Sequence, residues 1–251
     1  MTILRVTLWL LTFLALLTAG PVLTLAFRPA SLNGDWRTAT HRSTGLAPDP
    51  ATYAGAVVQV YASRAFNWRG AFAVHTWVAA KPAGASHYTR YEVIGWNVFR
   101  GGSAVSVSDF QAPDAEWYGS RPRVVRDVRG PEAEAIIAKL EHVVASYPYA
   151  HTYTAWPGPN SNTFVAYLGR EIPELRLTLP SLAIGKDYLP DGRIFARTPS
   201  GTGFQMSLGG FLGVLAGVDE GFELNVLGLV TGFDMLHPAV KLPGIGRIPA
   251  S

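Results

Sequence analysis

The N-terminal apolar run constrains this chain more than any other feature of its sequence. Arg5 precedes the run and Arg28 closes it. Between Val6 and Phe27 the residues that are not plainly apolar are Thr7, Thr12, Thr18, Gly20, Pro21 and Thr24. As a helix the run would extend about 33 Å, which is enough to cross the hydrocarbon core of a bilayer. The chain is therefore expected to be directed to a membrane.

The same run must be either a retained transmembrane anchor or a cleaved signal peptide. Signal peptides usually have a shorter apolar stretch and a small-x-small cleavage site. Thr24-Leu25-Ala26 fits such a site only passably, so an uncleaved anchor is favoured over a signal. Arg5 on the inner side would leave the bulk of the chain outside, although Arg28 weakens the charge contrast. A buried core helix is the third alternative.

The rest of the chain divides into three expected regions. Residues 29–52 contain Pro and Gly without an apolar period and predict a tether. Residues 53–175 predict an α+β core, and residues 176–251 a Gly-rich extension packed on that core. With 48% apolar and 16% charged residues, the composition is that of a folded chain and not of a disordered one.

Local patterns predict an antiparallel sheet packed against a few helices. The expected strands are 57–62, 71–80, 88–99 and, more weakly, 104–108. The expected helices run from 131 to about 147 and from 161 or 162 to 169. Arg121, Arg123, Arg126 and Arg129 indicate a solvated loop and helix start. Farther along, Phe204–Ala216 and Phe222–Phe233 predict strands or short helices packed on the domain, with a membrane-apposed hairpin as the alternative.

Several classes of chemistry have no support in the sequence. The chain contains no cysteine, which excludes disulfides, thiolate zinc sites and a cysteine nucleophile. Its six histidines show no metal-site spacing, and its glycines form no phosphate-binding loop. A net charge of +3 does not argue for nucleic acid. We expect no metal, no cofactor and no nucleic-acid partner, and the oligomeric state is left open.

Two short segments suggest a catalytic pair. His75 lies in an expected strand, and Ser161 lies at the start of an expected helix. A helix N-terminus stabilises a nucleophilic anion and an oxyanion, while a histidine on a neighbouring strand can act as base. A third polar group must orient that histidine, and Glu92 on the next expected strand is the best candidate. The predicted catalytic residues are therefore Ser161, His75 and Glu92.

The same residues also have a structural interpretation. Asn and Ser often cap helix N-termini, and a single histidine on an apolar strand is usually a hydrogen-bonded core residue. Aromatic residues crowd both segments and could wall a groove for acyl or sugar-peptide ligands. The predicted ligand-binding residues are Asn160, Asn162, Trp77, Tyr153 and Trp156. Structural capping, an inert groove and active Ser/His chemistry all stay open.

The order of a strand histidine, a polar strand residue and Asn160-Ser161-Asn162-Thr163-Phe164 resembles the circularly permuted papain-like proteins. These are the relatives of NlpC-type lipoproteins and of lecithin:retinol acyltransferase, in which Asn-Cys-x-x-Phe begins the nucleophile helix. Here Ser161 replaces that cysteine. The chain also resembles an uncharacterised bacterial family of membrane-associated proteins, through Gly158–Phe164 and the tail Leu242–Arg247. These resemblances imply a papain-like groove at the bacterial cell membrane, on its periplasmic or extracellular side.

Three functions follow as expectations. The first is a membrane-anchored envelope protein that binds a lipid- or peptidoglycan-like ligand without catalysis. The second is an amidase, esterase or acyltransferase that uses Ser161 and His75. The third is a structural interaction protein at the membrane. Replacing a thiol by a hydroxyl favours the first, because a hydroxyl is much harder to deprotonate.

Overall fold

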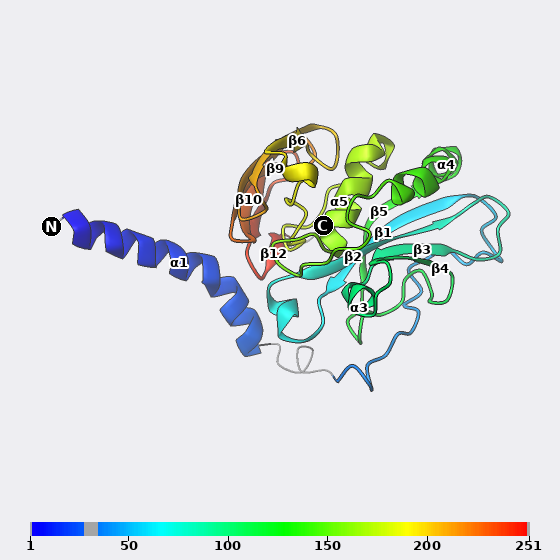
Figure 1. The fold of residues 1–251 in the computed structure, drawn as a ribbon, viewed down its shortest axis with the longest axis horizontal. Coiled ribbons are helices and arrows are strands. Elements are labelled where there is room, and N and C mark those ends of the chain that lie inside the picture. Colours follow the sequence, from blue (N-terminus) through cyan, green and yellow to red (C-terminus); the bar gives the residue numbers. More distant parts are fainter. Residues whose placement is uncertain (1, 28–34, 250–251) are drawn as a thin grey trace.

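Two antiparallel sheets with helix α5 between them form the body of the protein, and helix α1 projects from it (Figure 1). This computed structural model describes residues 2–27 and 35–249. The mixture of helices and antiparallel sheets, with an apolar N-terminal helix, confirms the predicted α+β class.

The first sheet has five strands in the order β4-β3-β2-β1-β5. Their bounds are Val57–Arg64 (β1), Val74–Lys81 (β2), Thr89–Val93 (β3), Val105–Ser108 (β4) and Arg123–Arg129 (β5). The prediction of a loop at the arginine run was wrong, because β5 pairs with β1 along this run. Val128 of β5 is buried while Arg123 and Arg129 are exposed, so the strand buries its apolar residues at the sheet edge.

Two predicted strands are shorter than expected. The first begins at Val74, after the 3-10 helix η1 (Asn67–Ala71). The second ends at Val93, and the short helix α3 (Gly95–Phe99) replaces its continuation. A Cβ at residue 95 would lie 2.5 Å from the Tyr153 ring. The chain therefore turns at Gly95 because only a glycine leaves room for that aromatic ring.

Helices α4 (Pro131–Ala145) and α5 (Ser161–Glu171) cover one face of this sheet. The predicted apolar face of α4 is buried through Ile136, Leu140, Val143 and Val144. Phe164 and Leu168 of α5 are fully buried in the same core. The helix after residue 161 therefore begins where the sequence predicted and is fixed on the sheet by packing. The 3-10 helices η2 (Pro173–Leu175) and η3 (Pro190–Gly192) follow it.

The opposite face of the five-stranded sheet carries a second, aromatic cluster. Its buried residues are Val57, Tyr61, Trp77, Ala79, Tyr88 and Trp117. Part of the expected tether covers this side, since the Asp114 carboxylate accepts hydrogen bonds from Ser43, Leu46 and Ala47. Residues 28–34 of the tether lie outside the described residues.

The second sheet has seven strands that follow one another in chain order. They are Phe195–Arg197 (β6), Gly203–Leu208 (β7), Leu212–Gly217 (β8), Gly221–Val226 (β9), Leu229–Asp234 (β10), Ala239–Leu242 (β11) and Gly246–Ile248 (β12). The sequence predicted strands or short helices for two segments of this region, and both form strands. Each segment, Phe204–Ala216 and Phe222–Phe233, is a hairpin.

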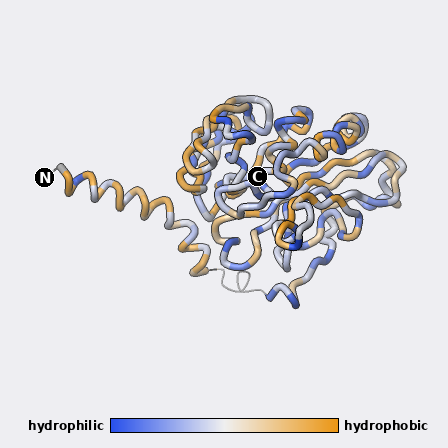
Figure 2. The backbone as a smooth tube through the Cα atoms, in the orientation of Figure 1, coloured by the Kyte–Doolittle hydropathy of each residue, from blue (hydrophilic) through white to orange (hydrophobic). Residues whose placement is uncertain are grey.

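Helix α1 (Thr2–Phe27) is apolar over almost its whole length (Figure 2). Its segment Ile3–Phe27 is long and apolar enough to cross a membrane, so it could be a membrane anchor or a signal sequence. Near its end, Leu17, Gly20 and Pro21 are buried against the body of the protein. The Thr24 hydroxyl donates a hydrogen bond of 3.2 Å to the Gly244 carbonyl.

Candidate functional site

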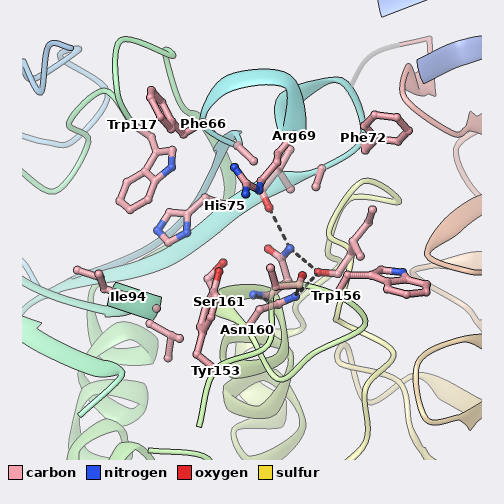
Figure 3. A pocket seen from close by; sticks show the side chains of 18 of the residues that line it. Phe66, Arg69, Phe72, His75, Ile94, Trp117, Tyr153, Trp156, Asn160 and Ser161 are labelled. Atoms are coloured by element: carbon pink, nitrogen blue, oxygen red, sulfur yellow. Dashed lines mark hydrogen bonds between the residues drawn. The ribbon is translucent and has the colours of Figure 1, made fainter. Parts of the chain in front are cut away.

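A pocket lies where four elements meet: η1, the first two residues of β2, helix α3 and the N-terminus of α5. Its volume is about 830 Å³, which falls in the range of ligand sites. Its lining is mainly apolar and includes the aromatic residues Phe66, Trp68, Phe72, Trp96, Phe99, Trp117, Tyr153 and Trp156. His75 and Ser161 both line it. Figure 3 shows His75 across the pocket from Tyr153 and the Asn160–Ser161 turn.

His75 is held by a buried acid on the neighbouring strand. Its Nε2 lies 3.1 Å from the Glu92 Oε2. Glu92 in turn lies beside Arg90, whose Nη2 donates to Oε2 at 3.0 Å and whose Nε is 2.9 Å from Oε1. All three residues are at most 6% exposed. The structure thus brings together two of the three predicted catalytic residues and adds an arginine behind them.

This arrangement sets the proton positions on His75. Burial lowers the pKa of His75 despite the opposing effect of its hydrogen bond to the Glu92 carboxylate. Burial raises the pKa of Glu92, but the contacts with His75 and Arg90 together outweigh it and leave the pKa low. Glu92 is therefore an acceptor at neutral pH, and the neutral imidazole must donate Nε2–H to it. The lone pair of Nδ1 remains for another partner.

The His75 ring also packs against aromatic rings. It stacks on Trp117 with ring centroids 3.6 Å apart, and Trp96 stacks on the same tryptophan at 6.5 Å. Trp77 stacks on His75 at 5.7 Å from within the core. A histidine fixed by a carboxylate on one nitrogen and by the Trp117 ring against one face keeps one orientation, which is what a positioned base or ligand-binding group requires.

Ser161 is the first residue of α5 and is 4% exposed. The preceding Asn160 caps the helix, because its side chain accepts hydrogen bonds from the Asn162 and Thr163 amides. Within the described part of the chain, the Ser161 hydroxyl and its backbone N–H make no hydrogen bond, and none joins Ser161 to His75. Ser161 is therefore not the cap; the capping interpretation belongs to Asn160.

Asn160 and Asn162 line the pocket, but their amides are used within the protein. The Asn160 Nδ2 donates to the carbonyls of Ala155 and Ile184. The Asn162 Nδ2 donates to the carbonyls of Val74 and Ile184, and its Oδ1 accepts from Thr76. These bonds join the start of α5 to β2 and to the 184 loop, so both residues position Ser161 and leave no amide hydrogen for a ligand.

The three predicted aromatic ligand-binding residues have different places. Tyr153 is half-buried in the pocket wall, and burial raises its pKa. Trp156 is half-exposed in the wall and donates from Nε1 to the Leu227 carbonyl of the second sheet at 2.9 Å. Trp77 is fully buried beneath the site and is not part of the pocket lining. Its ring instead supports the Arg90 guanidinium at 4.2 Å.

Three contributors were missed from the sequence. Arg90 is two residues before Glu92 and so shares its strand face, which the period of two could have indicated. Trp117 reaches His75 from a distant loop, and no local pattern reveals that contact. Arg69, which lines the pocket from η1, brings a positive charge to it. Among the residues that the structure describes, no group of three His, Asp or Glu residues could hold a metal ion.

Comparison with known proteins identifies a family but no activity. Residues 55–188 match a family described as a protein of unknown function, DUF3750. The match covers β1 to the loop before η3 and thus contains His75, Glu92 and Ser161. No curated protein and no solved structure matches the chain.

Proposed function

We propose a function from the site itself, because the chain belongs to the DUF3750 family, whose function is unknown. The protein is a membrane-anchored envelope protein that binds an amphipathic ligand, an acyl chain with a polar end, in the pocket around His75. The supporting observation is an apolar, aromatic-lined pocket of about 830 Å³ with one oriented histidine and one unpaired hydroxyl in its wall. The strand-histidine and helix-serine order supports a permuted papain-like groove for this domain.

The chemistry of the wall favours an acyl chain. Flat tryptophan and phenylalanine surfaces bind methylene groups well, because burial of each CH₂ contributes about 0.8 kcal/mol. Polar groups are few: His75, Ser161 and Arg69 can face a ligand, while the two asparagine amides are saturated. A carboxylate, phosphate or ester at the end of the chain would find donors in Ser161 and Arg69, and the Nδ1 lone pair of His75 can accept a hydrogen bond from a hydroxyl group beside it. A sugar-rich ligand would need many more hydrogen bonds than this wall offers.

The position of the pocket beside α1 favours a ligand from the membrane. Helix η1, which carries Trp68 and Arg69, packs against α1. Trp68, Trp156 and Leu227 line the pocket and are each about half exposed. A lipid held near α1 would therefore meet an apolar entrance, and it would not have to cross water to reach His75.

The first test uses the tryptophans of the pocket as reporters. Trp68, Trp96, Trp117 and Trp156 line it, so a brominated fatty acid should quench their fluorescence when its chain enters. The full chain, carrying Trp9→Phe to silence α1, is titrated in detergent with dibromostearic acid. We expect the quenching to saturate at a low concentration of dibromostearic acid. An unbrominated fatty acid should compete with it and restore the fluorescence. Quenching that rises linearly without saturation would contradict a defined site.

Two neighbouring substitutions make a matched pair for this test. Ala155→Phe places a ring in the pocket wall, whereas Thr154→Phe adds the same ring to an exposed residue outside the lining. We expect Ala155→Phe to weaken binding about tenfold, because it occupies volume that an acyl chain needs. Thr154→Phe should bind as the parent does. Equal affinity of the two variants would place the ligand elsewhere.

A second candidate function, acyl transfer or hydrolysis, is favoured by the His75–Glu92 pair. With Nε2–H donated to Glu92, Nδ1 can accept the Ser161 proton as Oγ attacks an ester or amide carbonyl carbon. The C–O or C–N bond then breaks, and the leaving alcohol or amine takes the proton from Nδ1. Water or another alcohol would accept the acyl group from Ser161. Such hydrogen bonds are often absent without substrate, so the unpaired hydroxyl does not oppose this chemistry.

A fluorophosphonate probe tests this second function, because it labels only activated serines. If Ser161 is a nucleophile, labelling of the full chain should fall at least about 100-fold in Ser161→Ala and in His75→Ala. The controls are Ser63→Ala, a buried serine outside the pocket, and His87→Ala, an exposed histidine. Both should label normally. If all variants label equally, or none does, the pocket binds a ligand without this catalysis.

A further inference from the structure

The seven-stranded sheet is inverted relative to an ordinary surface sheet. Along β7, Gln205 and Ser207 are buried while Phe204, Met206 and Leu208 are exposed. An antiparallel sheet with one face in water normally buries its apolar side chains and exposes its polar ones. Here the inner face carries the polar side chains of β7 and β9 together with Leu215 and Val230, while Phe204, Met206 and Leu208 face away from the body of the protein.

Strand pairing joins these apolar residues into one surface. Phe204 pairs with Ala216, Ala216 with Phe222, and Phe222 with Phe233, whose neighbour in β11 is Val240. The rings of Phe222 and Phe233 stack at 5.5 Å. We call this surface the outer face and define it by Phe204, Met206, Leu208, Phe222, Phe233 and Val240. Each is between 37% and 71% exposed. Contiguous apolar surfaces of this kind mark interaction sites.

Helix α1 lies at the edge of this same sheet. It packs against β10 and against the turn between β11 and β12. Contact with the turn is so close that a Cβ on Gly20 would lie 1.9 Å from the Pro243 carbonyl oxygen. In Figure 1, α1 and the seven-stranded sheet lie on the same side of the molecule. Whatever surrounds α1 is therefore next to the outer face.

The length of α1 fixes how close a bilayer must come. Residues 3–16 are exposed and Leu17 is the first residue buried against the body. These exposed residues extend about 21 Å, which is short of a hydrocarbon core about 30 Å thick. To span it, the helix must also use residues up to about Val22. Those residues include Gly20 and Pro21, which touch the β11–β12 turn, so the turn must lie at the hydrocarbon boundary.

From these observations we infer that the outer face rests on the lipid bilayer surface. The inference rests on the proposed anchoring by α1 and adds a second, peripheral contact to it. Phenylalanine, methionine and leucine side chains would enter the interfacial region, while Arg197, whose guanidinium lies 5.9 Å over the Phe204 ring, can reach phosphate groups at the rim. Exposure of the apolar side chains on the outer face is then explained, because this sheet has lipid where other sheets have water.

The absence of cysteine makes a site-specific test simple, since each introduced cysteine is unique. Phe204→Cys and Phe233→Cys report on the outer face, Leu8→Cys on α1, and Phe110→Cys, 91% exposed in a loop of the other sheet region, is the matched control. Each full-length variant carries a nitrobenzoxadiazole label in vesicles of phosphatidylcholine and phosphatidylglycerol (about 3:1). Nitroxide lipids then quench labels that contact the bilayer.

We expect the labels at 204 and 233 to be quenched at least about threefold more than the label at 110. If the Leu8 label is quenched but those at 204 and 233 match 110, α1 is inserted and the outer face is not on lipid, which overturns the inference alone. If the Leu8 label is also unquenched, the anchor and the inference both fail. If labels at 204 and 233 are shielded from aqueous iodide but not reached by nitroxide lipid, a second copy or another protein covers the face, and the lipid proposal is again overturned.

Discussion

Replacing Glu223 by alanine is expected to lower the free energy of unfolding by about 3–5 kcal/mol. The Glu223 carboxylate lies 2.5 Å from Lys186 Nζ through Oε2 and 2.5 Å from Lys241 Nζ through Oε1. All three residues are at most 4% exposed, beneath the inverted sheet. Removal of the carboxylate leaves two buried ammonium groups with less counter-charge. The free-energy cost of removing these ammonium groups from water is then no longer offset.

A surface pair with the same contact distance is the control. Lys139 Nζ lies 2.5 Å from Glu174 Oε1, but these side chains are 47% and 43% exposed. Glu174→Ala should therefore cost no more than about 1 kcal/mol, because solvent screens the pair. Urea unfolding of the full chain in detergent, followed by circular dichroism, measures both variants. Similar losses in the two would mean that Glu223 is hydrated in solution and does not hold the second sheet on the body.

The same cluster predicts a dependence of stability on pH. Burial raises the pKa of Glu223, but its contacts with Lys186 and Lys241 outweigh burial and leave the pKa below that of an ordinary glutamate. A carboxylate with a lowered folded pKa contributes stability above its unfolded pKa and loses it as pH falls through the folded value. Stability of the wild type should therefore fall as the pH drops below about 4.5, and the fall should be smaller in Glu223→Ala.

Local chemistry predicted the parts of the fold that are controlled locally. The apolar period of Ile136 and Leu140, with Pro131 at its start, was sufficient for α4, and the Asn160 cap was sufficient for the beginning of α5. Runs rich in β-branched and aromatic residues indicated β1 and β2. His75 and Glu92 could be paired from their strands, because adjacent strands bring such residues together.

Features that depend on long-range contacts were not predictable from local patterns. The sequence of β5 is typical of a basic loop, because only its pairing with β1 shows that its arginines lie on an edge strand. Trp117 comes to His75 from a loop that only the tertiary fold brings near. In the second sheet, Phe204 and Met206 alternate with Gln205 and Ser207, which predicts a strand. The same alternation predicts that the apolar residues face the body of the protein, whereas Gln205 and Ser207 do so. The buried lysine–glutamate cluster decides the orientation, and it is assembled from Lys186, Glu223 and Lys241, which are far apart in sequence.

The second large effect is expected for Arg90→Met, which should raise the pKa of His75 and destabilise the protein by about 3–5 kcal/mol. Arg90 is 1% exposed, and its guanidinium neutralises Glu92 over the Trp77 ring. Without it, Glu92 is a buried carboxylate whose remaining partner is the imidazole of His75. Burial holds the pKa of His75 low, with the positive charge of Arg90 contributing in the same direction. Loss of that charge must therefore favour the imidazolium.

Nuclear magnetic resonance of ¹⁵N-histidine-labelled full chain measures the His75 titration, and urea unfolding measures stability. Adding Glu92→Gln to Arg90→Met removes the unpaired charge, so the double variant should recover much of the lost stability and lower the pKa of His75 again. Arg176→Met, which breaks the surface pair with Asp219 at 2.9 Å, should change stability by no more than about 1 kcal/mol. If Arg90→Met leaves the His75 titration unchanged, the arginine has only a packing role, and the carboxylate alone sets the state of the histidine. A raised His75 pKa would instead show that the two strands set the histidine's charge together, so that Arg90 controls the pH at which Nδ1 can accept a proton.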